Sequence, residues 1–401
     1  MSWSFDTNSR YHTQDTSYYC GAACAMMVLS EIGVSYADLD QDDLYTSNHD
    51  HNVQPGWYSD PYGVRFTLMD RKPASFANSF VVYKPTTEAE GTRKIVYTLQ
   101  HYQVSPIVMV YGCAHWIVVR GVQTDVDPGG GGPYVVEGFW VNNPVWEDNE
   151  PHGAGDVCGG GGAHGVEAQW VSYADWQATY FTGCAYDSGN GTLQYISVCD
   201  PDTPTIAEPR APKRERRFDG RKLIGAGQAA EVFWTELERR FTQSRDPSKV
   251  ARRVAERFGR ARLDPGQALL VKRLDRKDDF YWLVPALADG EGIAGWGQVD
   301  ARFGDLQSLY LLNEGAKRFD TRRSGLGRRI TGKRFDLGDG LGRLNLRPGT
   351  FCVHPTLVWR PCRQSYSPHL PFWMITAGAD TLYVRIDGRV YPALADAYKG
   401  S

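Results

Sequence analysis

The sequence lacks the segments that would anchor it in a membrane or send it through the general secretory route. No uninterrupted apolar run reaches about 18 residues, the length that indicates a membrane-spanning helix. The opening segment, MSWSFDTNSRYHT, has no basic region followed by an apolar core, so it does not form a secretory signal peptide. We therefore expect a protein without a membrane span that is cytoplasmic by default, and we leave signal-independent export open.

The cysteine pattern contains neither a disulfide framework nor a CxxC pair of the kind that binds zinc. Disulfide frameworks are dense in short secreted domains, whereas eight cysteines are spread here over 401 residues. We expect these cysteines, except the first, to be small buried hydrophobic side chains. They are Cys20, Cys24, Cys113, Cys158, Cys184, Cys199, Cys352 and Cys362.

Other residues that can bind metals or phosphate groups also lack a regular spacing. The glycine run at 159–162 has no following GK[ST], which phosphate-binding loops require. The histidines in SNHDHN are typical of an exposed polar loop, and those in the glycine-rich loops have no regular metal spacing. We therefore predict no metal and no cofactor at the five residues considered, which are His49, His51, His152, Cys158 and His164.

Charge divides the chain into two unlike halves. Residues 1–204 hold 24 acidic and 8 basic residues, a net charge of −16, while residues 205–401 hold 23 and 36, a net charge of +13. Between them, Asp200–Arg221 contains four prolines and a basic cluster, which is typical of an extended linker. We predict a first domain at 1–200, a linker at 201–221 and a basic region at 222–401.

Two interactions of the basic region follow from this asymmetry. Opposite potentials favour docking of the basic half against the acidic half within one chain. The basic runs KRERR and RRSGLGRR come with no nucleic-acid recognition motif. We therefore favour intramolecular docking or a solvated basic surface over nucleic-acid binding.

The first half reads as a helix followed by an antiparallel sheet. CGAACAMMVLSEIG has apolar residues near helical spacing and a glycine at its end that suits a helix stop. Residues 35–80 are polar and turn-rich, with one short helix expected near 36–45. Further on we expect a helix at 87–101, strands at 106–112, 115–122 and 134–141, and a last helix around VSYADWQATY. This order predicts the α+β class.

The second half begins with helical sequence at 227–258, broken near Asp246-Pro247, and continues with strands. LLVKRL…FYWLVPAL…GQVDARFGDLQSL can be aligned with TLVWRP…PFWMITAG…YVRIDGRVYPAL, although the spacing differs. We interpret the region as mixed α+β, compatible with an internal repeat of two subdomains at about 222–312 and 345–401.

The strongest chemical signal is Gln14 followed six residues later by Cys20 at a helix start. A thiol attacks as its thiolate, and a helix N-terminus lowers the thiol pKa. The small residues after Cys20 would let a substrate backbone come close. The backbone N–H of Cys20 and the side-chain amide of Gln14 could form an oxyanion hole. Cys24, one helical turn on, is expected to pack in the core.

A catalytic thiol also needs an imidazole and a group that orients it. His115 opens the strand HWIVVRGV, and the next strand ends in Asn142-Asn143-Pro144. We expect Asn143 to orient His115, with Asn142 as the alternative.

These residues together resemble the papain-like cysteine peptidase superfamily, and most closely its bacteriocin-processing (double-glycine leader) peptidase-like branch, over roughly residues 10–185. The resemblance implies that Gln14 lines the oxyanion hole, Cys20 attacks, His115 is base and acid, and Asn143 orients His115. That branch more commonly has Asp where Asn143 stands, and Asn supplies no negative charge to stabilise an imidazolium. No transporter membrane segment accompanies the motifs, so leader cleavage during export is not implied.

The predicted function is hydrolysis of a peptide bond in a peptide or protein substrate through a thioester on Cys20. Two alternatives remain open. The same residues could transfer the acyl group to an amine or deamidate glutamine, or the papain-like half could be an inactive binding module. The resemblance does not extend to residues 205–401, which we expect to recruit substrate or cover the active-site cleft.

Overall fold

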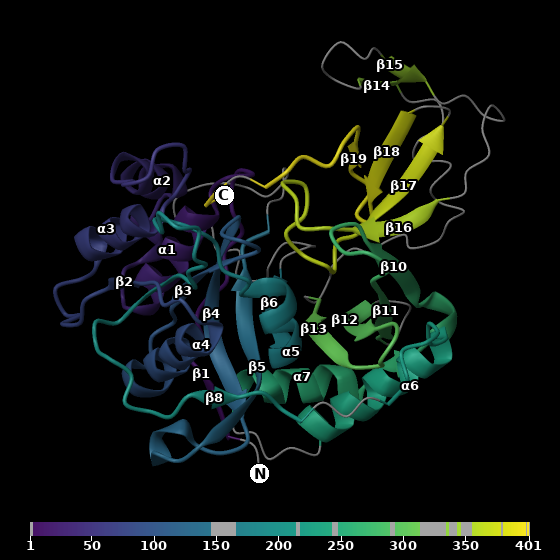
Figure 1. The fold of residues 1–401 in the computed structure, drawn as a ribbon, viewed down its shortest axis with the longest axis horizontal. Coiled ribbons are helices and arrows are strands. Elements are labelled where there is room, and N and C mark those ends of the chain that lie inside the picture. The colour runs from purple at the N-terminus through teal and green to yellow at the C-terminus, as the bar shows by residue number, and fades with distance from the viewer. Residues whose placement is uncertain are drawn as a thin grey trace.

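The computed structural model describes the chain except for residues 1–2, 146–165, 214–216, 243–247, 289–292, 313–333, 337–342, 346–354, 378–379, 398 and 401. The described part has helices and one large mixed sheet, so its class is α+β (Figure 1). Its α-helices are α1 (Cys20–Glu31), α2 (Gln41–Asp50), α3 (Pro61–Arg71), α4 (Glu88–Tyr97), α5 (Tyr173–Asp175), α6 (Ala226–Leu237) and α7 (Lys249–Gly259). Short turns of 3₁₀- or π-helix are η1 (Tyr36–Asp38), η2 (Thr98–Tyr102), η3 (Pro128–Gly130), η4 (Trp176–Tyr180), η5 (Glu238–Thr242) and η6 (Pro265–Gln267).

The strands of both halves belong to one continuous sheet. Those of the first half are β1 (Trp3–Asp6), β2 (Val81–Tyr83), β3 (Ile107–Val110), β4 (His115–Thr124), β5 (Tyr134–Asn143), β6 (Val166–Ser172), β7 (Ser197–Cys199) and β8 (Pro209–Arg210). Those of the second half are β9 (Arg262–Leu263), β10 (Leu269–Arg273), β11 (Phe280–Leu287), β12 (Ile293–Asp300), β13 (Leu306–Leu311), β16 (Thr356–Trp359), β17 (Phe372–Ala377), β18 (Asp380–Arg385) and β19 (Val390–Tyr391). A separate hairpin pairs β14 (Arg334–Asp336) with β15 (Arg343–Asn345).

Pairing along the main sheet runs β2, β7, β3, β4, β5, β6, β13, β12, β11, β10, β16, β17, β18, β19. Every step is antiparallel except β10 with β16, which is parallel. β1 pairs with the far end of β4, β8 pairs in parallel with β5, and β9 pairs with β11. The start of β4 lies beside the end of β5, and these are the fourth and fifth strands in that order.

Helix α1 is buried over its first ten residues, Cys20 to Leu29. It packs against β4 on one side and against α2 and α3 on the other. Because the helix is covered on both sides, it consists of small and apolar residues and has no polar face. The predicted stop is confirmed, because α1 ends at Glu31 and Gly33 adopts a positive φ of 106°.

The prediction for residues 35–80 placed one helix too early in the sequence and missed another. The short helix expected near 36–45 is a 3₁₀ turn followed by α2, and a whole further helix, α3, was missed. Helix α2 is polar, so apolar periodicity did not indicate it. Helix α3 buries Val64 and Leu68 at helical spacing, and that signal was overlooked. Their start signals were present: Asp40 and Asp60 accept hydrogen bonds from backbone N–H groups of the first turns, and Pro61 follows Asp60.

Strand β6 was also missed, and it joins the two halves of the chain. Val171 and Trp170 of β6 pair with Ser308 and Leu309 of β13. The last helix predicted for the first half begins only after β6, as α5 and η4.

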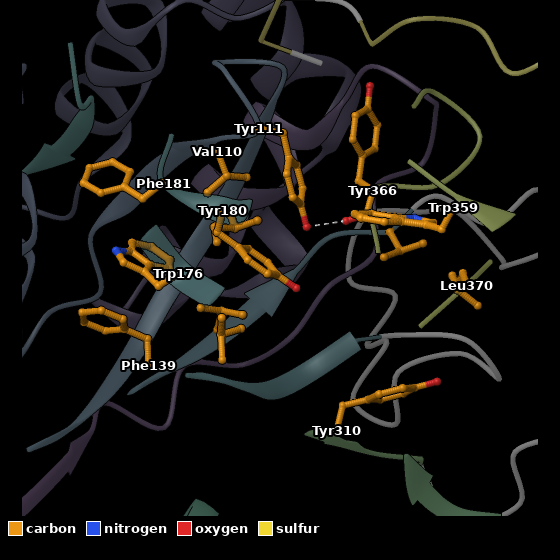
Figure 2. Close-up of a cluster of buried hydrophobic side chains, with 14 of the residues drawn as sticks. Val110, Tyr111, Phe139, Trp176, Tyr180, Phe181, Tyr310, Trp359, Tyr366 and Leu370 are labelled. Atoms are coloured by element: carbon orange, nitrogen blue, oxygen red, sulfur yellow. Dashed lines mark hydrogen bonds between the residues drawn. The ribbon is translucent and has the colours of Figure 1, made fainter. Parts of the chain in front are cut away.

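An aromatic cluster covers the same junction (Figure 2). From the first half it contains Val110, Tyr111, Phe139, Trp176, Tyr180 and Phe181, and from the second half Tyr310, Trp359, Tyr366 and Leu370. Two ion pairs cross between the halves as well: Arg240 with Glu137 at 3.0 Å, and Arg253 with Glu167 at 3.4 Å. The basic half therefore contacts the acidic half through backbone strand pairing, aromatic packing and a few ion pairs.

The two aligned stretches of the second half form comparable units. β10–β11–β12 and β16–β17–β18 are both antiparallel meanders, and their first strands, β10 and β16, pair with each other. The internal repeat and the domain limits stay predictions. Among the helices that the structure describes, none is both long and apolar enough to cross a membrane.

Buried His369 is expected to make stability depend on pH. Its Nε2 lies 2.9 Å from Ser308 Oγ, its ring packs edge-on to Tyr310, and no described group bonds its Nδ1. Burial lowers the pKa of His369 from 6.5 to about 3. The folded protein thus binds this proton less well than the unfolded chain, so stability is lost as pH falls below about 6.5.

At pH 5 this single group should lower the free energy of unfolding by about 2 kcal/mol relative to pH 7. Urea unfolding of the protein and of a His369→Gln variant at both pH values measures the effect. The variant should lose less stability than the parent on acidification. Equal losses in the two proteins would contradict the assignment.

Candidate active site

Cys20 is the first residue of α1, and its side chain is fully buried. Its Sγ accepts a hydrogen bond from the backbone N–H of Trp116 at 3.3 Å. Trp116 directly follows His115 at the start of β4. The packing of α1 on β4 thus places the Cys20 thiol against the backbone of the residue that follows His115.

His115 contacts the predicted carboxamide at the end of the neighbouring strand. Nε2 of His115 lies 2.8 Å from Oδ1 of Asn143. A carboxamide oxygen only accepts, so Nε2 carries the donated proton and Nδ1 is the basic nitrogen of the neutral ring. Asn142 faces elsewhere: its Oδ1 accepts from Ala168 N–H at 3.0 Å and its Nδ2 donates to Ser9 C=O at 3.2 Å. Asn143, and not Asn142, is therefore the partner of His115.

Tyr366 of the second half completes this group and was missed by sequence reasoning. Its ring is parallel to the His115 imidazole, with a centroid distance of 4.2 Å and an interplanar angle of 1°. Its carbonyl oxygen accepts hydrogen bonds from Asn143 Nδ2 at 3.1 Å and from the Tyr111 hydroxyl at 2.9 Å, the latter drawn in Figure 2. Tyr366 lies 223 residues from Asn143, and no local motif marks it.

Gln14 is buried beside the start of α1. Its Nε2 donates to the carbonyl of Thr16 at 2.7 Å, and the backbone N–H of Tyr19 donates to the same carbonyl at 3.4 Å. Because an amide nitrogen carries two hydrogens, this bond leaves one hydrogen of Gln14 Nε2 for a further acceptor. Its Oε1 has no hydrogen-bond partner among the residues that the structure describes.

The predicted lowering of the Cys20 pKa is not what the structure gives. Burial raises the pKa of the Cys20 thiol far above its usual range, and the N–H groups of Trp116, Gly21 and Cys20 itself lower it only in part. The reason is that a thiolate loses its hydration in a dry site, and this cost exceeds the gain at the helix start. The thiol is therefore protonated in this form.

The small residues after Cys20 also have a different role from the one predicted. A Cβ on Gly21 would lie 2.7 Å from the Cβ of Ser59, so this glycine admits the segment before α3 and leaves no open space for a substrate. That segment is held firmly. The carboxylate of Asp60 accepts hydrogen bonds from four backbone N–H groups and from the Tyr186 hydroxyl.

A disulfide next to the site corrects the prediction that the later cysteines are merely buried hydrophobic residues. Cys113 is bonded to Cys184, 71 residues away. Cys113 closes a turn between β3 and β4 in which Tyr111, Gly112 and Cys113 have positive φ angles of 55°, 67° and 64°. The bond ties this unusual turn, two residues before His115, to the segment after η4.

Such a pair was not visible in the sequence because the two cysteines meet only in the folded sheet. Cys20, Cys24, Cys199 and Cys362 are free and buried. Cys158 and Cys352 lie outside the described residues.

No group of three or more His, Cys, Asp or Glu within the described ranges is arranged to hold a metal ion. His49 and His51 are exposed at the end of α2, and the His51 ring stacks on Phe66. His152, Cys158 and His164 fall in the segment 146–165, and the basic run RRSGLGRR falls in 313–333, both outside the described residues.

Removing the disulfide should destabilise the protein markedly. For a bond that closes a loop of 71 residues, a Cys113→Ala/Cys184→Ala double variant should lose about 4 kcal/mol of unfolding free energy. Urea unfolding with and without dithiothreitol measures this. Reductant should lower the stability of the parent protein to that of the double variant and leave the variant unchanged; a parent protein indifferent to reductant would contradict the bond.

An imidazole and a carboxamide therefore meet where β4 and β5 lie side by side, and the thiol of α1 contacts the backbone one residue beyond that imidazole. This set can support nucleophilic acyl chemistry if the thiol gives its proton to the imidazole. No protein-family model, curated protein or solved structure matches this chain, so a function has to be argued from these residues alone.

Proposed function

We propose that the chain is a papain-like cysteine peptidase that hydrolyses a peptide bond through a thioester on Cys20. The observation that carries the proposal is the hydrogen bond from His115 to Asn143 at the place where the Trp116 N–H contacts Cys20 Sγ. This supports a chain of roles in which Cys20 attacks, His115 is the base and Asn143 orients it.

In the first step His115 Nδ1 takes the proton of the Cys20 thiol, and the sulfur attacks the carbonyl carbon of the substrate. Gln14 Nε2 and the backbone N–H of Cys20 donate to the oxyanion that forms. The tetrahedral intermediate collapses when the carbon–nitrogen bond breaks. The imidazolium gives its proton to the leaving amine, and the acyl group remains on sulfur as a thioester.

In the second step water replaces the amine. His115 removes a proton from the water as it attacks the thioester carbon, and the proton returns to sulfur when the acid leaves. Asn143 keeps Nε2 protonated throughout, which reserves Nδ1 for these transfers. Because Asn143 is neutral, it stabilises the imidazolium less than a carboxylate would.

The second half serves the same site in this proposal. Tyr366 shields the His115–Asn143 bond by stacking on the imidazole, and its carbonyl holds the amide of Asn143. A hydrogen bond shielded from water is electrostatically stronger than an exposed one. The basic region is therefore proposed to regulate or complete the site, with recruitment of substrate as a further role.

The disulfide supports a location outside a reducing compartment. Disulfides persist in oxidising environments and are rare in the cytosol, and the Cys113–Cys184 bond lies beside the catalytic imidazole. This favours signal-independent export, left open above, over the cytoplasmic default.

One observation favours a second candidate, a binding module without turnover. Cys20 and His115 have no exposed surface in this form, and burial raises the pKa of Cys20. If the site stayed closed to substrate, the protein would retain its fold and would not catalyse hydrolysis.

Substitution of either reacting residue should abolish activity on a mixture of fluorogenic peptides. Cys20→Ala and His115→Ala should each lower kcat/KM at least about 10,000-fold. The nucleophile and its base act as one unit, so removal of either residue also removes the contribution of the other. Cys24→Ala, one turn along α1, is the matched control and should retain activity within a few fold.

Intact-mass measurement separates the alternatives for the acyl group. Added hydroxylamine should capture the thioester as a hydroxamate, whereas products formed only with an added amine would indicate an acyltransferase. Release of ammonia from a glutamine peptide would indicate a deamidase. Equal rates for the parent and Cys20→Ala proteins would overturn the proposal.

The stacking of Tyr366 predicts a graded effect on turnover. Tyr366→Ala should lower kcat about two- to tenfold, because an aromatic pair contributes about 0.5–1.5 kcal/mol and 1.36 kcal/mol is tenfold in rate. Tyr366→Phe retains the ring and should stay near the parent value. The pH dependence of kcat should shift in Tyr366→Ala alone; unchanged profiles in both variants would exclude a positioning role.

A further inference from the structure

The last described residues of the chain return from the second half to the candidate active site. Figure 1 shows this end of the chain beside the helices of the first half. Three backbone hydrogen bonds hold it there. Tyr58 N–H donates to the Lys399 carbonyl at 3.2 Å, Ser59 N–H donates to the Gly400 carbonyl at 3.2 Å, and Gly400 N–H donates to the Cys113 carbonyl at 3.0 Å.

Both backbone segments that hold it also flank the reacting groups. The carbonyl of Ser59 accepts from the indole N–H of Trp116 at 2.9 Å, and the backbone N–H of Trp116 bonds Cys20 Sγ. On the other side, Cys113 lies two residues before His115 in the turn secured by the disulfide. The returning segment thus bridges the backbone next to Trp116, which contacts the thiol, and the turn that precedes His115.

The segment is recognised through its backbone and through the absence of one side chain. Gly400 has a φ of 67°, and a Cβ there would lie 2.1 Å from the Ser59 carbonyl oxygen and 3.1 Å from the Trp57 ring. Lys399 is exposed, with its ammonium 5.9 Å from the centre of the Trp57 ring. The segment is therefore a turn held by main-chain hydrogen bonds, with Gly400 in the left-handed conformation that favours glycine.

The stretch that leads to this segment is attached next to Tyr366. The Arg360 guanidinium pairs with Asp396 at 2.6 Å, and the N–H of Arg363 donates to the Ala395 carbonyl at 3.2 Å. Ala395 N–H donates in turn to the Gln364 side chain at 3.0 Å. The same part of the second half therefore carries both the ring over His115 and the segment across the site.

We propose that Lys399–Gly400, bonded to the backbone of Tyr58, Ser59 and Cys113, blocks access to Cys20 and holds the site in a self-inhibited form, an inference that rests on the proposed function. A substrate or partner that competes for the three backbone hydrogen bonds releases the segment and admits water and reagents to Cys20. The complete burial of Cys20 and His115 is then a property of the closed form.

Substitution of Gly400 tests this without requiring turnover. In Gly400→Val the valine cannot occupy the place of the glycine, because φ is positive there and its Cβ would collide with the Ser59 carbonyl oxygen. The rate of iodoacetamide alkylation of Cys20, followed by mass spectrometry in the full chain, should rise roughly 10- to 100-fold as the bonds that close the site are lost.

Two matched variants control for strain and for the lysine side chain. Gly131→Val introduces the same strain at a φ of 75° in an exposed loop with no heavy atom within 4 Å, and should leave the Cys20 rate unchanged. Lys399→Ala keeps the three backbone bonds and should change the rate less than about threefold. An excess of synthetic peptide with the sequence of residues 394–401 should slow alkylation of Gly400→Val again.

The outcomes separate this inference from the proposed function. Faster alkylation of Gly400→Val alone supports the inhibitory segment, and if no peptide is then hydrolysed, the peptidase proposal fails while the segment stands. An unchanged rate, or an equal rise in Gly131→Val, overturns the inhibitory segment. Cys20-dependent hydrolysis at the same rate in the parent and Gly400→Val proteins would also overturn it and leave the peptidase proposal intact.

Discussion

The side-chain amide of Asn143 makes two hydrogen bonds on which the arrangement around the thiol depends. Its oxygen accepts from His115 in the first half, and its nitrogen donates to the carbonyl of Tyr366 in the second. A carboxylate at this position could accept from the imidazole, but it could not donate to a carbonyl oxygen and would be a buried charge. An asparagine at this position therefore bonds both neighbours without burying a charge.

The exclusion of water from the site has opposite effects on the imidazole and on the thiol. Exclusion of water strengthens the hydrogen bonds of the His115–Asn143–Tyr366 group, because the local dielectric is low. The same exclusion keeps the Cys20 thiol neutral, since burial raises its pKa. For the proposed peptidase, orientation of the imidazole and ionisation of the thiol therefore make contrary demands on solvent, and a form that admits solvent to the thiol while Tyr366 stays in place satisfies both.

The two halves differ in charge but share one sheet. The change of net charge coincides with the proline-rich stretch, yet β6 of the acidic half pairs with β13 of the basic half, and an aromatic cluster lies across the same junction (Figure 2). Ion pairs such as Arg253 with Glu167 are partly exposed, and pairs of that kind contribute about 0–1 kcal/mol. Backbone pairing and aromatic burial, more than charge, join the acidic half to the basic half.

The sequence alone determined the elements whose signals are local. The buried helix at Cys20, the strands that carry His115 and Asn143, and the order of these residues follow from apolar patterns and motif spacing, which depend on neighbours in the chain. The polar helix α2 carried a local cap but little apolar period, and its predicted position was displaced. Helix α3 carried both a cap and the apolar pair Val64 and Leu68, and was missed although its signals are local. Only the tertiary structure decided which asparagine meets the imidazole, that Cys113 bonds Cys184, that Tyr366 covers His115, and that Gly400 lies against Ser59. Each of these contacts joins residues distant in the chain, and the thiol pKa depends on the burial they produce, which no local pattern encodes.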